Sequence, residues 1–298
     1  MKTRKNMNLK FGLFSLIIGL LLAACAPEPL EIVVPPLESK VVVFSQIIPE
    51  VGTVVLLTRS FGALDFNEDN GDTLTNDFLN QLLVSGAQVV LRYRDFTDTL
   101  EEVEAGTGIY AAFETGYFPN EDYTLDIQTA EGETLTATSR MLPVVPFETI
   151  SPTIDPNGGD TIVRVDYSFV DPPGDNWYMI NFYTNGEPQN DEFDINSYFQ
   201  SGSTLLKKTR LLSDAVFDSA LHEGSVKLDN IRTNDSLVVT ISNINEAYYR
   251  FLDLRKNSSN FFTELTKEPV NYPTNVDGGL GFFNTHFPDA RFFDLNDY

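Results

Sequence analysis

The only cysteine of the 298-residue chain, Cys25, follows an apolar run from Phe11 to Leu22. As a helix this run would be about 18 Å long, which is too short to cross a hydrocarbon core of about 30 Å. Basic residues precede it, and the small residues Ala23 and Ala24 separate it from the cysteine. This order is typical of a cleaved export signal, so we expect residues 1–24 to be removed.

The residues Leu22–Cys25 match the lipobox of bacterial lipoproteins. The match predicts that Cys25 is lipidated and becomes the first residue of the mature chain, held firmly at a membrane because several acyl chains bind far better than one. The alternative is an ordinary secretory signal with an incidental cysteine. In either case no intrachain disulfide can form, so the fold must be stable through packing alone.

Removal of residues 1–24 takes away four of the 20 Lys and Arg and none of the 43 Asp and Glu, which leaves a net charge of −27. Such an acidic chain is a poor partner for nucleic acid, whose binding depends on neutralising phosphates. It is equally unsuited to lying flat on anionic lipid. At about 150 residues per domain, the length favours two domains.

A proline-rich segment, residues 25–39, is predicted to be a semi-extended tether. Prolines also restrict the backbone around residues 142–146, where we place a domain boundary. The fold class predicted is mainly β, with two β-sandwich-like domains at residues 40–145 and 146–298, because short runs of β-branched residues alternate with Gly, Asn and Asp turns. The expected strands are 41–48, 53–60, 87–94, 108–115, 123–129, 134–141, 160–170, 176–184, 225–231, 237–244 and 278–283.

Two helices are expected beside these strands. Apolar residues recur on one face between Asn245 and Arg255, as in a helix packed on a sheet. A shorter helix is predicted over residues 77–83. In the last predicted strand, residues 278–283, glycines would allow close packing.

An acidic segment with no basic residue runs from Ser60 to Leu91. Its oxygen-rich side chains are of the kind that calcium prefers, but in comparison with an EF-hand loop the glycine falls one place late and Asn76 replaces the bidentate Glu. The segment therefore either binds calcium or forms a solvated hairpin loop. No other cofactor is predicted. The candidate calcium ligands are Asp65, Asn67, Asp69 and Asp72.

Aromatic residues crowd one predicted strand, where Trp177 and Tyr183 share one face while Tyr178 and Phe182 share the other. One face should be core. The first pair is a candidate surface for binding a sugar ring or a partner protein; the alternative is that both faces are buried.

No arrangement typical of an active site appears in the sequence. The two histidines, His222 and His286, are far apart and have no metal-ligand spacing or neighbouring nucleophile turn. The many carboxylates carry little information in so acidic a chain. We therefore predict that the protein is not an enzyme, and that His286 is structural.

Five runs follow the lipobox in order: Val84–Val89, Gly108–Tyr110, Tyr123–Ile127, Asp171–Tyr178 and Pro273–Phe283. Together they resemble the Bacteroidota outer-membrane lipoproteins grouped as domain of unknown function 4249. The resemblance implies an immunoglobulin-like or transthyretin-like first domain and a β-rich second one. It also implies an accessory or ligand-binding subunit beside a TonB-dependent outer-membrane transporter, with no catalytic residues.

The alternative function is a surface adhesin that binds carbohydrate or protein, and either face of the outer membrane remains possible. Five Asp-Thr or Asp-Ser triplets also match the O-glycosylation pattern of exported Bacteroidota proteins, although a turn Asp before a strand gives the same pattern. The candidate acceptors are Thr73, Thr99, Thr161, Ser219 and Ser236.

Overall fold

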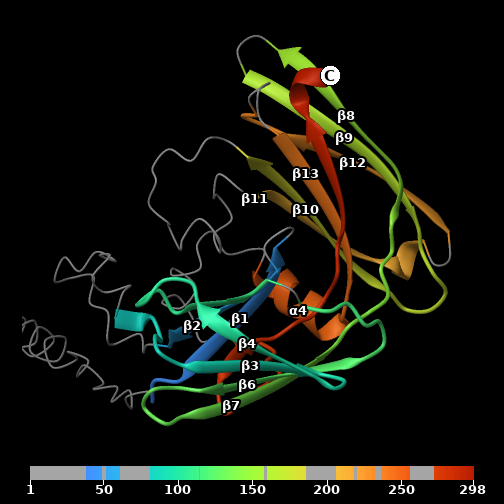
Figure 1. Ribbon diagram of the computed structural model, residues 1–298. Helices are drawn as coiled ribbons and strands as arrows, with labels where there is room; N and C mark the ends of the chain where they lie inside the picture. Colours follow the sequence, from blue (N-terminus) through green and yellow to red (C-terminus); the bar gives the residue numbers. More distant parts are fainter. Residues whose placement is uncertain are drawn as a thin grey trace, which may run out of the picture. The chain divides into compact units, whose positions relative to one another are not determined.

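The computed structural model describes residues 38–48, 52–60, 81–113, 115–157, 160–185, 206–217, 220–231, 236–255 and 272–298. These residues belong to one compact unit, Leu37–Tyr298. They form three sheets (Figure 1), which confirms the prediction of a mainly β fold. No helix among the described residues is long and apolar enough to cross a membrane.

The first sheet has the strand order β14-β7-β6-β3-β4-β5-β2-β1-β15. All neighbours are antiparallel except β1 and β15, which are parallel. In β6 the buried residues Tyr123, Leu125 and Ile127 alternate with more exposed ones, as the sequence predicted. The bounds are β1 Val41–Ile48, β2 Gly52–Arg59, β3 Gln88–Tyr93, β4 Phe96–Glu102, β5 Ile109–Ala112, β6 Asp122–Gln128, β7 Thr134–Arg140, β14 Val276–Asp277 and β15 Leu280–Phe282.

The two edge strands of this sheet are joined by only Gly278 and Gly279, so the sheet nearly closes on itself around one apolar core. Gly281 lies so close to β1 that a Cβ atom there would be 2.0 Å from the Val43 carbonyl oxygen. Close packing at these glycines agrees with the sequence-based expectation. The sequence did not indicate that they close the first sheet.

Asn275 holds the closing segment in place. Its Nδ2 donates to the carbonyl oxygens of Thr138, at 3.0 Å, and Phe283, at 2.7 Å. Its Oδ1 accepts from the backbone N–H of Phe283 at 2.9 Å. One amide side chain therefore supplies strand-like hydrogen bonds where the strand itself ends.

The remaining strands form a sandwich of a four-stranded sheet, β11-β10-β13-β16, and a three-stranded sheet, β12-β9-β8. Immunoglobulin-like sandwiches divide their strands similarly. Side chains from both sheets share one core, and Figure 1 shows β10 beside β13. The bounds are β8 Phe147–Asn157, β9 Asp160–Val170, β10 Trp177–Asn185, β11 Leu206–Ser213, β12 Leu221–Leu228, β13 Ser236–Ile244 and β16 Asp289–Asp294.

The helix α4 (Glu246–Arg255) confirms the predicted helix within a residue, and short 3-10 turns lie at Asp214–Val216 and Leu295–Asp297. Of the second predicted helix, only residues 81–83 are described, and Gln81 and Leu82 are helical.

A third apolar cluster, which we call the junction cluster, joins the first sheet to the sandwich. It packs Val42 and Phe44 of β1 against Met179 of β10, Phe251 of α4 and Phe282 of β15. The chain between β13 and β16 thus carries the helix at this junction and the two strands that close the first sheet. The predicted division into two independent domains is not confirmed, because these contacts unite the described residues in one compact unit.

Candidate binding sites on the first sheet

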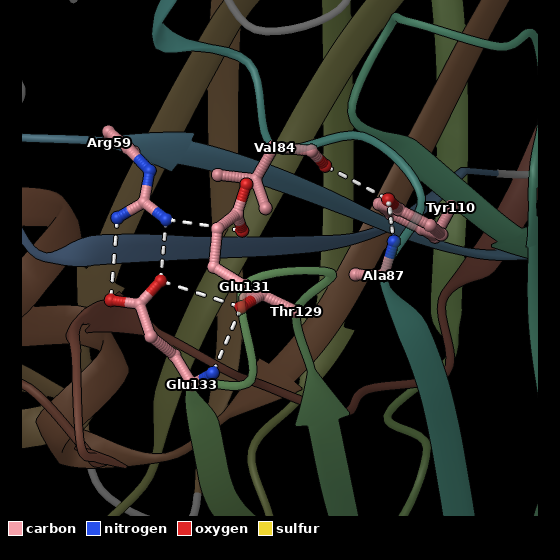
Figure 2. Close-up of polar contacts among 7 residues, drawn as sticks. All are labelled: Arg59, Val84, Ala87, Tyr110, Thr129, Glu131 and Glu133. Atoms are coloured by element: carbon pink, nitrogen blue, oxygen red, sulfur yellow. Dashed lines mark hydrogen bonds and ion pairs between the residues drawn. The ribbon is translucent and has the colours of Figure 1, made fainter.

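Two of the runs singled out in the sequence meet at one end of the first sheet. The Tyr110 hydroxyl donates to the Val84 carbonyl oxygen and accepts from the Ala87 N–H, both at 2.9 Å (Figure 2). Glu102 accepts from the N–H groups of Gly86 and Gly108, both at 3.0 Å. Burial raises the pKa of Glu102, but these and further hydrogen bonds lower it more, so its carboxylate form is stabilised.

An ion pair spans the closure of the sheet (Figure 2). Arg59 at the end of β2 lies 2.5 Å from Glu133 and 3.3 Å from Glu131, in the turn between β6 and β7. The hydrogen bond from Arg59 lowers the pKa of Glu133 below its usual value. The strands β2 and β7 are not neighbours in the sheet. The Arg59 ion pair therefore joins the two ends of the sheet, as the β14–β15 segment does.

An aromatic surface lies at the turn between β3 and β4; we define it as Tyr93, Arg94, Phe96 and Phe118. The ring of Phe96 stacks on Tyr93 at 5.5 Å and on Phe118 at 5.6 Å. The guanidinium carbon of Arg94 lies 4.6 Å from the Phe118 ring centroid. Phe96 is 51% exposed, so the stack presents an apolar face to solvent beside a cation.

Hydrogen bonds hold Tyr93 and the backbone of Phe118 within this aromatic surface. The Tyr93 hydroxyl donates to Asp98 at 2.6 Å and accepts from the Gly116 N–H at 3.0 Å. Burial and the hydrogen bond to Asp98 raise the pKa of Tyr93 to about 12. The Tyr123 hydroxyl donates to the Gly116 carbonyl and accepts from the Phe118 N–H. The fold therefore fixes Tyr93 and the backbone at Phe118, the two residues on which Phe96 stacks, as expected for a preorganised contact surface.

A polar groove of about 440 Å³ lies on the outer face of the same sheet. Its floor is the ion pair between Arg92 and Asp126, with Thr136 donating to Asp126 at 3.0 Å. The described residues that line it are Gln88, Val90, Arg92, Asp126, Ile127, Gln128, Thr134, Leu135, Thr136, Asp277 and Gly278. Nothing in the sequence analysis pointed to this groove, because its side chains come from four separate strands.

A sequence model described as "Domain of unknown function (DUF4249)" matches residues 27–286. The chain belongs to this family. No curated protein matches the chain. Among solved structures, the fibronectin domains FN1–FN3 of chicken CNTN1 are similar at 12% identity and a TM-score of 0.23, over 71% of this chain and 63% of that one.

In this DUF4249 chain the candidate pair of β10, Trp177 and Tyr183, is only half-buried. Trp177 packs against the junction cluster. On the other face of β10, Tyr178 and Phe182 are fully buried in the sandwich core. Trp177 and Tyr183 do not belong to the aromatic surface of the first sheet, which contains the exposed Phe96.

The other predicted sites are only partly within the described residues. Thr99 and Ser236 are exposed on β4 and β13, and Thr161 lies in β9. Asp98 before Thr99 accepts from Tyr93, which gives that Asp a structural role. The structure describes no group of His, Cys, Asp and Glu that could hold a metal within those residues. Outside the described residues lie Cys25, Asp65, Asn67, Asp69, Asp72, Thr73 and Ser219.

Both histidines have apolar or amide surroundings. His222 packs on Phe217 at 4.3 Å and Phe169 at 5.1 Å, and burial lowers its pKa. His286 is 2% exposed and its Nδ1 lies 3.1 Å from Asn284 Nδ2. Burial lowers the pKa of His286 to about 4. These surroundings support the prediction that His286 is structural.

Proposed function

We propose that the mature chain is a lipid-anchored, non-enzymatic accessory subunit of the outer membrane, which docks beside a TonB-dependent β-barrel transporter. The observation that supports docking most directly is the exposed stack of the aromatic surface. Aromatic residues and Arg are enriched at the centres of protein interfaces, where they contribute most of the binding energy. Phe96 and Arg94 have this chemistry and lie on a preformed turn.

A second aromatic contact extends this argument. Tyr117, adjacent to Phe118 in sequence, packs on Phe287 at 4.8 Å, and Phe287 is 43% exposed. The Tyr117 hydroxyl accepts from the Val144 N–H at 2.9 Å. A large exposed ring such as Phe287, packed on a tyrosine that a hydrogen bond holds in place, fits a surface that a partner covers.

The docking proposal is tested by mild detergent extraction and co-purification of the mature chain from its native membrane. We expect a β-barrel partner in stoichiometric amount, and its loss in Phe96→Ala because the stack loses its exposed ring. Phe292→Ala is the matched control, since Phe292 is 54% exposed on β16 and outside the aromatic surface. A partner retained equally by both variants, or a chain recovered alone, would contradict the proposal.

The lipid anchor is tested by the intact mass of the same purified chain. We expect a chain that begins at Cys25 and carries the added mass of acyl groups. A chain that begins elsewhere, or one without added lipid mass, would refute the anchor. The same spectrum tests the O-glycosylation hypothesis, because glycans at Thr99 or Ser236 would add further mass.

The alternative function, a surface adhesin, is supported by a different observation, the polar groove. The groove and the aromatic surface belong to different parts of the same sheet, so each can be tested without the other.

A further inference from the structure

Strand register places polar side chains of the groove in rows across the sheet. One row pairs Val90 with Asp126 and Asp126 with Thr136, and a neighbouring row pairs Gln88 with Gln128 and Gln128 with Thr134. Residues two apart on a strand point to the same side. Both rows therefore face outward, and β14 adds Asp277 opposite Thr136.

The groove contains both occupied and unoccupied hydrogen-bonding groups. Arg92, Asp126 and Thr136 bind one another and form a fixed floor. The side chains of Gln88 and Gln128 are exposed and make no hydrogen bond to another described residue. Each amide offers two N–H donors and a carbonyl acceptor in one plane. The two amides are opposite each other in the register, so a ligand across the strands could bind both.

Charge limits the class of ligand. Among the described lining residues there is one basic residue, Arg92, which is paired with Asp126, and one further carboxylate, Asp277. In a chain with a mature net charge of −27, this is a nearly neutral region. A phosphorylated or carboxylated ligand would find no free cation among these described residues and would be repelled by the surrounding field. Neutral, hydroxyl-rich ligands match the unpaired amides without a charge penalty.

The size and the apolar part of the groove agree with this class. About 440 Å³ is within the range of roughly 300–1,000 Å³ for small-ligand sites. Val90, half-buried between Gln88 and Arg92 on β3, offers an apolar spot for the C–H face of a sugar ring. We propose that the groove binds a neutral oligosaccharide, with Gln88 and Gln128 as hydrogen-bonding residues and Val90 beneath the ring.

The test is affinity electrophoresis of the full-length chain in detergent, through gels that contain laminarin, xyloglucan or galactomannan. Polygalacturonate serves as the acidic comparison. We expect at least one neutral polysaccharide to retard the chain and polygalacturonate to have no effect. The double variant Gln88→Ala/Gln128→Ala should weaken the apparent affinity by about tenfold or more, as the loss of two hydrogen-bonding groups predicts.

Gln81→Ala is the matched control, because Gln81 is exposed and does not line the groove; it should bind like the unmodified chain. Thermal melting of the double variant should match that of the unmodified chain, since neither amide holds another described residue. Lack of retardation by all three neutral polysaccharides, equal retardation by polygalacturonate, or unchanged binding of the double variant would each overturn the proposal. None of these results depends on the anchor or on the aromatic surface.

Discussion

Replacing Gly281 with alanine is expected to lower the free energy of unfolding by about 4 kcal/mol or more, at the upper end of single substitutions. The new Cβ would lie 2.0 Å from the carbonyl oxygen and 2.8 Å from the nitrogen of Val43. Both atoms are backbone atoms of β1, so no side chain can move aside. Relief requires β15 to separate from β1, which opens the sheet at its closure.

The matched control is Gly132→Ala. Gly132 and Gly281 share a φ of +91°, but an added Cβ at Gly132 meets no atom within 4 Å. Gly132→Ala should therefore cost only the backbone strain of an L-residue at positive φ, about 1 kcal/mol. Urea unfolding followed by circular dichroism measures both variants. Hydrogen exchange at residues 42–44 should rise only in Gly281→Ala. Equal losses in the two variants would show that close approach to Val43 does not matter.

Two kinds of strand were predicted well from the sequence. The strands β2 and β13 are almost continuously buried, and runs of apolar and β-branched residues predicted both within a residue. Strands with one solvent-facing and one buried side were predicted from their alternation. In β7 every second residue is buried, and the alternation follows from this. The strand β4 escaped prediction because only Leu100 of its seven residues is buried, while the others, Phe96 and five Thr, Asp and Glu residues, are exposed or partly exposed. Its position is determined by pairing with β3 and β5, which no local pattern encodes.

The closure of the first sheet could not be predicted for a related reason. The strands β14 and β15 have two and three residues, which is too short for a periodic signal. Gly281 pairs with Val43, and the two residues are separated by most of the sequence. Glycines in this segment correctly indicated close packing, but a single sequence does not identify the strand that they approach.

The candidate sites show the same contrast between features of one strand and features that depend on several. Sequence made Trp177 and Tyr183 a candidate pair because they share one face of a strand, with burial as the alternative, and Trp177 packs against the junction cluster. The exposed stack instead combines Phe96 from a hairpin with Phe118 from a loop, and their contact arises only after folding. The groove likewise depends on strand register. Patterns within one element were predictable, and surfaces assembled from several elements were not.

The buried polar groups around His286 give the last prediction, a loss of stability as pH falls. Asn245 Nδ2 donates to Asn284 Oδ1 at 3.2 Å, which leaves the Asn284 Nδ2 to donate to His286 Nδ1. Nδ1 must then be an acceptor, so the ring is neutral. Burial of the charged ring lowers the pKa of His286, and protonation would also place an N–H against the Asn284 amide donor.

The pKa of His286 is about 4 in the folded chain and 6.5 in the unfolded chain. Between these values the unfolded state binds more protons, so stability is full above pH 6.5 and is lost as pH falls towards 4. The difference between pH 7 and pH 5 should be about 2 kcal/mol. In His286→Gln, whose Oε1 can still accept from Asn284, most of this dependence should vanish. His222→Gln is the control: it removes the contribution of His222, whose pKa burial also lowers, but should retain the contribution of His286. Urea unfolding at the two pH values measures the slope, and equal slopes for the unmodified chain and His286→Gln would refute this role.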